Sequence, residues 1–239
     1  MPKNCSFTLK FSDNDFRAYF SPSIQLNWPT ELALISIDLY NVFPNITKTN
    51  NIFRWSEIKN GEKEWKEIEV PVDYYDADSL LDYLNGNNKK PNKPFIIKYD
   101  EKLLKFEINL GKDVTVDFSH KRSMNILFGF NKMELTEKSN KSSSIPDLDP
   151  IKNVFVECDI VNGNENYLNG DKSKVIFNFP VDCDMGEKIR AEPYNLLYVS
   201  TVTNIINDIG VSLKDSEGNL LNLNNSTVVL KLHLRGATS

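Results

Sequence analysis

Two runs near the C-terminus alternate between apolar and polar side chains, and they constrain the fold more than any other feature of the sequence. Apolar residues occupy one face of both runs: Ile209, Val211, Leu213, Val228, Leu230, Leu232 and Leu234. Side chains of a β-strand point alternately to opposite faces, so each run predicts a strand with one buried face. Turn clusters at 215–219 and 224–226 lie between the runs, and Gly218 can take the positive φ of a tight turn. We therefore expect a terminal hairpin that is paired inside a sheet.

Further strand patterns fill the rest of the chain, and strands and helices do not alternate as they do in βαβ units. We expect strands at 4–12, 16–20, 24–28, 31–43, 51–58, 65–72, 95–99, 103–110, 114–118, 154–161, 175–179, 188–190 and 196–203. Pro22 separates two of these segments, and Pro29 ends the second, because proline cannot donate to a strand ladder. Segment 31–43 is apolar on both faces, which predicts a central strand of a sandwich. The pattern predicts an all-β fold, an antiparallel sandwich or barrel.

Local signals predict one hairpin and two short helices. The dipeptide Asn60-Gly61 joins two strand patterns and is a strong hairpin signal. A helix is expected over 78–85, behind the capping cluster 76–79. A second helix is expected between Ser119 as its N-cap and Gly129 as its C-terminal stop.

A stretch rich in Ser and Lys, residues 136–150, is expected to form a long surface loop and to be the main candidate for a domain boundary. A chain of 239 residues can form one all-β domain, and we expect a single domain over 1–239 that carries this loop. The alternative is a pair of β-sandwich subdomains, 1–135 and 151–239.

The composition argues against several classes of protein. The formal net charge is -5, whereas a domain that binds the phosphates of nucleic acid usually has a net positive charge. We therefore expect no direct nucleic-acid binding. A local basic patch is not excluded by the net charge. No apolar run has the length of a membrane span, and the N-terminus lacks the apolar region of a signal peptide. The cysteines Cys5, Cys158 and Cys183 are odd in number and widely spaced, which predicts free thiols in a reducing compartment.

Residues that could carry chemistry are few, and each has a simpler structural explanation. Two histidines, His120 and His233, are too few for a histidine metal site, and we expect both to face solvent or an interface. Two acid pairs could share a proton or hold a metal, but both lie in apparent loops where Asp is ordinary turn chemistry. These pairs are Asp147 with Asp149 and Asp182 with Asp184.

The tryptophans Trp55 and Trp65 flank the Asn60-Gly61 turn. They could stack on a sugar, but a cross-strand pair in the core is the simpler explanation. The sequence contains no Ser-His-Asp set with a nucleophile motif and no Gly-rich phosphate loop. We therefore expect no catalytic, cofactor-binding or metal-binding residue and no cofactor. The residues by themselves predict a soluble, intracellular, all-β module that is not an enzyme.

Several segments, taken in order, resemble a known family. They are Ile24-Gln25-Leu26, 28–34, Tyr74-Tyr75, 80–85, 123–130, 154–160 and the end from Val211 through Leu232-His233-Leu234-Arg235. This order is similar to that of the minor capsid (penton) proteins of Polinton/Maverick elements, adintoviruses and virophages, over nearly the whole chain. The Leu-His-Leu-Arg ending and the Leu-Phe-Gly-Phe helix stop at 127–130 are the most specific parts.

The resemblance implies a jelly-roll β-sandwich and a structural role. It implies a vertex capsomer of an icosahedral particle, a homo-oligomer (a pentamer) set among trimers of a double-jelly-roll major capsid protein. It also implies a place in the virion capsid, with assembly in the cytoplasm or nucleus of a host. The family motifs are core and turn positions, so no catalytic or binding residue is carried over.

Two other functions stay open. The first is an intracellular β-sandwich binding module for a carbohydrate or peptide, which should be monomeric and have one concave pocket carrying the Trp residues. A small enzyme on the same fold is the third and most distant alternative.

Overall fold

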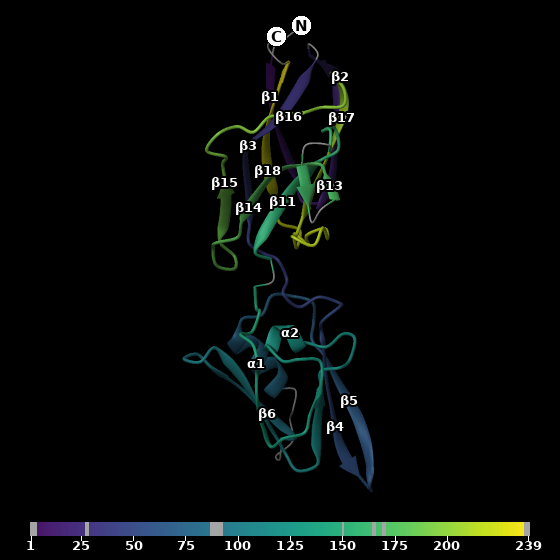
Figure 1. The fold of residues 1–239 in the computed structure, drawn as a ribbon, viewed down its shortest axis with the longest axis vertical. Helices are drawn as coiled ribbons and strands as arrows, with labels where there is room; N and C mark the ends of the chain where they lie inside the picture. Colours follow the sequence, from purple (N-terminus) through teal and green to yellow (C-terminus); the bar gives the residue numbers. More distant parts are fainter. Residues whose placement is uncertain are drawn as a thin grey trace. The chain divides into compact units, whose positions relative to one another are not determined.

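The computed structural model describes residues 4–26, 29–86, 93–149, 151–163, 166–168 and 171–236, which form two compact units (Figure 1). Unit 1 combines Met1–Phe43 with Ile151–Ser239, and unit 2 is Pro44–Pro150. These boundaries differ from both arrangements expected from the sequence, one domain over 1–239 or a pair at 1–135 and 151–239. The reason is that the first strands of the chain pair with the last ones, and such distant pairing leaves no local trace in a sequence.

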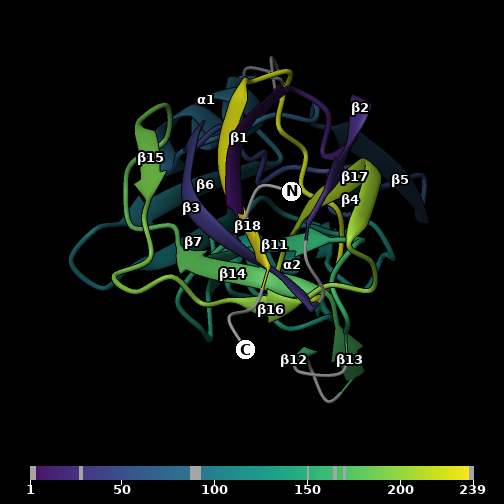
Figure 2. The same cartoon turned by 90° about the horizontal axis from the view of Figure 1, so that it is seen from above.

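Unit 1 consists of two antiparallel sheets (Figure 2). The first contains, in spatial order, β1 (Asn4–Phe11), β18 (Val228–Gly236), β3 (Thr30–Tyr40) and β15 (Lys188–Ala191), with β16 (Val199–Ser200) also paired to β3. The second contains β14 (Val175–Pro180), β11 (Asn153–Cys158), β17 (Ile205–Lys214) and β2 (Asp15–Gln25). A separate ribbon pairs β12 (Asn166–Leu168) with β13 (Asp171–Ser173).

The order in which the chain visits these sheets is that of a jelly roll. The chain changes sheet at most steps, and it stays within one sheet from β11 to β14 and from β15 to β16. Inward-facing residues of both sheets form one apolar core. The predicted fold class, an all-β antiparallel jelly roll with two short helices, is confirmed.

The two C-terminal strands bury the predicted faces but do not form the predicted hairpin. β17 pairs with β2 and β11, whereas β18 pairs with β1 and β3, so they lie in opposite sheets. Leu213 and Leu232 belong to the same core cluster, and both are fully buried. The predicted hairpin is therefore wrong. Alternation shows which face is buried, but it does not identify the neighbouring strand, and residues 215–227 are long enough to cross between the sheets.

Strand β3 lies inside its sheet, as its two apolar faces predicted, but its pattern has another cause. Lys231 pairs with Ser36 and Leu232 pairs with Leu34, so Ile35 is an extra residue in β3. This bulge shifts the phase of the strand. The core-facing residues are consequently Leu32, Leu34, Ile37 and Leu39.

Strand β2 is continuous, although the sequence predicted two pieces separated at Pro22. The strand runs from Asp15 to Gln25 and lies at the edge of the second sheet. An edge strand can include proline because one side of its ladder needs no donor. The predicted strand end at 27–28 lies outside the described residues.

Unit 2 contains two smaller antiparallel sheets and both helices. One sheet has the order β5 (Glu62–Glu69), β4 (Ile52–Lys59), β8 (Val114–Asp117) and β9 (Glu134–Leu135). The other has the order β10 (Ser139–Lys141), β7 (Lys105–Leu110) and β6 (Phe95–Asp100), and the helices are α1 (Ala77–Gly86) and α2 (Asn125–Phe128). Fully buried aromatic rings form its centre, with centroids 4.9 Å apart for Phe53 and Phe95 and 4.6 Å for Phe106 and Phe128. This core is separate from that of unit 1.

The local predictions for unit 2 are mostly confirmed. Asn60 and Gly61, with φ of 52° and 85°, turn the β4–β5 hairpin, and α1 covers the predicted helix. Gly129 ends α2 in the left-handed region at φ 71°, where a side chain would collide with the Ser144 carbonyl.

Two predictions for unit 2 differ from the structure. Ser119 does not cap α2, which begins at Asn125; its backbone N–H and hydroxyl donate to Asp117 instead. Residues 136–150, predicted as a surface loop, include β10, which pairs with β7. Its polar side chains hide it from pattern analysis, since backbone hydrogen bonds rather than apolar faces hold it in place.

Candidate functional surfaces

His233 lies on β18, on the face directed away from the core of unit 1. Its Nδ1 atom is 2.7 Å from the hydroxyl oxygen of Tyr198. The Arg235 guanidinium lies 3.4 Å from the centre of the Tyr198 ring, and its Nε donates to Glu31 at 2.8 Å. These contacts hold the segment before β16 against the sheet. The role that the structure shows for His233 is therefore to position Tyr198.

The other predicted polar residues are not brought together. His120 lies in unit 2 and accepts the Arg122 backbone N–H at 3.3 Å. The Asp149 carboxylate accepts a hydrogen bond from Tyr74, and Asp182 and Asp184 lie exposed in the turn before β15. Within the described ranges, no group of three or more His, Cys, Asp or Glu residues has the geometry to hold a metal ion. No described helix is long and apolar enough to span a bilayer.

The two tryptophans of the β4–β5 hairpin do not face a common hollow. Trp55 is 7% exposed and packs edge-on against Phe95, with ring centroids 5.6 Å apart. Trp65 lies on the opposite face of the hairpin, with the Arg54 guanidinium 4.5 Å and the Lys63 ammonium 5.0 Å from its ring. Cation–π contacts of this kind stabilise a surface ring. Trp28 lies outside the described residues.

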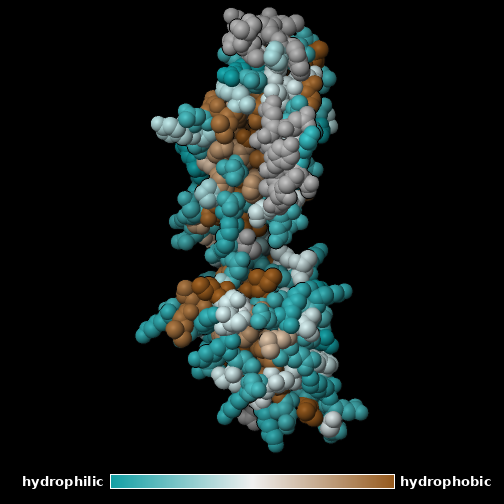
Figure 3. Space-filling model, viewed as in Figure 1, coloured by the Kyte–Doolittle hydropathy of each residue, from teal (hydrophilic) through white to brown (hydrophobic). Residues whose placement is uncertain are grey.

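A row of exposed apolar side chains follows β15 in unit 1. We name residues 194–205 the apolar strap; its exposed members are Tyr194, Leu196, Leu197, Val202 and Ile205. Tyr194 is 97% exposed and Leu197 is 63% exposed. Figure 3 shows apolar side chains at the surface of both units, between hydrophilic ones. Large apolar side chains exposed along one segment make it a candidate interaction surface.

A hollow of about 580 Å³ lies on the surface of unit 2. Its lining residues are Lys48, Asn51, Glu69, Val70, Pro71, Val72 and Arg122. They come from the loop before β4, from the end of β5 and the segment after it, and from the loop before α2. The hollow is open to solvent and has the volume of a small-molecule site.

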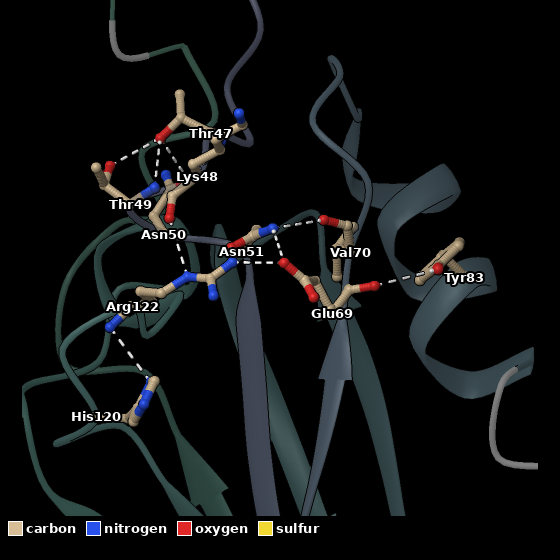
Figure 4. A network of polar contacts seen from close by, with 10 residues as sticks. All are labelled: Thr47, Lys48, Thr49, Asn50, Asn51, Glu69, Val70, Tyr83, His120 and Arg122. Carbon is tan, nitrogen blue, oxygen red and sulfur yellow. Dashed lines mark hydrogen bonds and ion pairs between the residues drawn. The ribbon is translucent and has the colours of Figure 1, made fainter.

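The Arg122 guanidinium is the best-held polar group in the hollow (Figure 4). Its Nε donates to the Lys48 carbonyl at 3.0 Å, and its Nη2 donates to Asn51 at 2.6 Å and to Glu69 at 2.5 Å. Asn51 is 3% exposed and also donates to the Val70 carbonyl at 3.1 Å. The hydrogen bond from Arg122 lowers the pKa of Glu69, and the hydrogen bond from Asn51 adds to this effect. Glu69 is consequently ionised at neutral pH.

Sequence reasoning missed both surfaces. The apolar strap was predicted in part as a strand at 196–203, and its adjacent Leu196 and Leu197 break the alternation of a half-buried strand. That break in the alternation is a sequence signal from which the exposed apolar segment could have been predicted. The hollow in unit 2 has no such sequence signal, because Lys48, Glu69 and Arg122 are far apart in the sequence and each is an ordinary surface residue type.

The fold is a jelly roll with a second unit inserted between β3 and β11. One solved structure with this architecture is the mavirus penton protein, with a TM-score of 0.53 and 12% sequence identity. The match covers 99% of this chain and 100% of that one, so it includes both units. No protein-family model matches the sequence, and no curated protein matches it either. The likeness is therefore one of fold.

Proposed function

We propose that this chain is a penton-like minor capsid protein of the virophage type, with a structural rather than an enzymatic role. The observation that carries the proposal is the structural match to the mavirus penton protein over both full lengths. Sharing the jelly roll alone would be weak support, because many unrelated proteins use that fold. Sharing the inserted unit as well makes the architecture much more specific.

The layout of unit 1 supports this role. Asn4 pairs with Arg235, so the start of β1 and the end of β18 lie at one end of the jelly roll. Tyr40 and Asn153, next to the connections to unit 2, lie at the opposite end, together with Phe11, Val228 and Lys214. The connections to unit 2 therefore leave unit 1 at one end of the jelly roll and not from its long sides, which suits side-by-side packing around a symmetry axis.

The proposed partners are further copies of the same chain and a double-jelly-roll major capsid protein. We propose that the capsomer is a homopentamer in the virion capsid, formed in the host cytoplasm or nucleus, and that the family extends to Polinton/Maverick elements and adintoviruses. The apolar strap is the surface that suits a subunit contact, because side chains such as Tyr194 and Leu197 otherwise stay in water.

The first test is the mass of the purified chain in solution, measured by light scattering over a range of concentrations. A discrete pentamer is the expected result. A monomer at every concentration, both alone and with the major capsid protein of the same particle, contradicts the proposal.

The second test places a charge on the apolar strap. The variant Leu197→Asp should dissociate the oligomer without lowering the melting temperature of the monomer, because Leu197 is exposed. Leu103→Asp is the matched control, since Leu103 is 58% exposed but belongs to unit 2. Equal oligomer stability in both variants would show that the apolar strap is not part of the interface. It would not contradict the pentamer, which the mass measurement tests separately.

A further inference from the structure

We propose that the hollow of unit 2 binds a carboxylate-bearing ligand in which the acid is flanked by a hydrogen-bond donor and an apolar group. Lys48 and Arg122 would take the carboxylate, Glu69 the donor, and Pro71 with Val72 the apolar part. This site is independent of the proposed capsid role, which assigns no ligand to unit 2.

Arg122 is held in place before any ligand arrives. Three acceptors on two segments hold its Nε and Nη2 atoms: the Lys48 carbonyl and Asn51 in the loop before β4, and Glu69 at the end of β5. The remaining nitrogen, Nη1, makes no hydrogen bond or ion pair with any described residue, and Figure 4 shows it without a dashed line. A guanidinium with fixed orientation and a free N–H pair is a preorganised carboxylate donor.

Lys48 adds a second cation to the same hollow. Its side chain is exposed, and its ammonium has no ion pair among the described residues. The turn beneath it is fixed by hydrogen bonds: Thr47 N–H donates to Asn50 Oδ1 at 2.7 Å, and Asn50 donates to the Asn45 carbonyl at 3.0 Å. With one carboxylate and two cations in its lining, the hollow has a net positive charge that favours an anion.

The rest of the lining restricts the chemistry of the ligand. Glu69 uses Oε1 for Asn51 and Arg122, whereas its Oε2 accepts nothing from the described residues. That oxygen is an acceptor for an N–H or O–H of the ligand. Pro71 and Val72 form an apolar wall, and Val72 is 40% exposed. A free mineral anion would use the cations alone, whereas an acylated amino acid or an acidic N-acetyl sugar would use all three features.

The two sources of such a group are the C-terminus of a peptide and a sialic-acid-type sugar, and the test separates them. The full chain, labelled with ¹⁵N, is titrated with N-acetyl-leucine and with N-acetylneuraminic acid, followed by NMR. The neutral counterparts, N-acetyl-leucinamide and the methyl ester of the sugar acid, serve as ligand controls. We expect one acid to shift the side-chain signals of Asn51 and Arg122, and its neutral counterpart to leave them unchanged.

Two pairs of variants localise the binding. Lys48→Gln should weaken the affinity about five- to tenfold, the effect of losing one charge-assisted contact. Lys112→Gln should leave the affinity unchanged, because Lys112 is exposed in the β7–β8 turn and does not line the hollow. Val72→Glu should abolish binding by repulsion, and the uncharged Val72→Gln should retain it.

Three outcomes overturn the proposal: neither acid binds, the neutral counterparts bind equally well, or Lys48→Gln and Lys112→Gln have equal affinities. Because none of these variants lies in unit 1, the oligomeric state measured by light scattering reports separately on the capsid role.

Discussion

The Asp159 carboxylate occupies the space that a side chain at position 210 would need, and this position is a glycine. Asp159 accepts the Gly210 backbone N–H at 2.7 Å through Oδ1 and Nη2 of Arg17 at 2.7 Å through Oδ2. Arg17 also forms an ion pair with Asp208. The hydrogen bond to Asp208, followed by the one to Asp159, raises the pKa of Arg17. These contacts cross β2 and β17 and extend to the residue that follows β11.

We predict that Gly210→Ala destabilises the protein. A Cβ atom at this position would lie 2.6 Å from Oδ2 of Asp159 and 3.0 Å from Nη2 of Arg17, so the network must shift. Overpacking of this kind costs about 1–3 kcal/mol of unfolding free energy. Urea denaturation measures the loss, and Gly163→Ala is the control, since the nearest atoms there are 3.4 Å away. Equal stability of the two variants would contradict the prediction.

The three cysteines are free thiols in different surroundings. Cys158 is 1% exposed, and burial raises its pKa to about 12. Burial also raises the pKa of Cys5 and Cys183, but both are only partly buried. The thiolate is the reactive form, so access and pKa together set the rate of alkylation.

We predict that iodoacetamide at mildly alkaline pH modifies Cys5 and Cys183 in the native protein and leaves Cys158 unmodified. In urea all three should react. Mass spectrometry of the peptides measures each site separately. Modification of native Cys158 as fast as that of Cys183 would show that the core opens readily.

Edge strands are protected by composition and local charge. β5, at the edge of its sheet, carries alternating Lys and Glu residues, and Lys66 donates to Glu57 on the neighbouring β4 at 2.7 Å. Lys63 pairs with Glu134 at 2.8 Å. Charges on an exposed edge oppose edge-to-edge association of sheets. Association is thereby disfavoured at this edge, while the apolar strap lies exposed on unit 1.

Helix α1 begins with a side-chain cap whose strength should depend on pH. Oδ1 of Asp76 accepts the Ser79 hydroxyl at 2.6 Å and the Ser79 backbone N–H at 2.8 Å. These hydrogen bonds, the hydroxyl first, lower the pKa of Asp76 below its ordinary value of 3.8. A depressed folded-state pKa stabilises the fold above the unfolded pKa, and that stabilisation is lost as the pH falls through the folded pKa.

We predict that Asp76→Ala lowers the unfolding free energy by about 1 kcal/mol at neutral pH. The difference from the unsubstituted protein should begin to shrink as the pH falls below the ordinary pKa of 3.8, and it should be smallest once Asp76 is protonated in the folded protein as well. Thermal unfolding at several pH values measures this. Asp76→Asn should retain most of the cap at all pH values, and a difference that is constant down to pH 2 would contradict the role of the charge.

The two ends of unit 2 are joined by hydrogen bonds, and unit 2 has a core of its own. Asn45 is 1% exposed, and its amide donates to the carbonyls of Tyr75 and Leu148 at 2.7 Å each. The residues at which the chain enters and leaves unit 2 are thus joined through one side chain. A segment whose ends meet and whose core is separate has the properties of an independent folding unit.

We predict that a fragment of residues 44–150 folds on its own and unfolds cooperatively. A fragment of residues 44–135 should not, because it lacks β10 and the Leu148 carbonyl that Asn45 binds. NMR signal dispersion and thermal unfolding measure both. Conversely, unit 1 with residues 44–150 replaced by a short Gly/Ser linker should keep its jelly roll. Failure of both the 44–150 fragment and the linked unit 1 to fold would show that the units stabilise one another.

The sequence by itself determined where most of the strands lie, which face of several of them is buried, and where several turns and helices lie. Val211 and Leu230 are buried as their alternation predicted, and the Asn60-Gly61 turn and the Gly129 helix end follow from conformations that few residues adopt. Only the tertiary structure decided that β17 and β18 lie in opposite sheets, that Ile35 is a bulge, and that unit 2 is inserted between β3 and β11. It also decided that Lys48, Glu69 and Arg122 share one hollow. The physical reason is that the direction of a side chain follows from the backbone geometry of its own strand, whereas strand partners and shared surfaces depend on contacts between residues far apart in the chain.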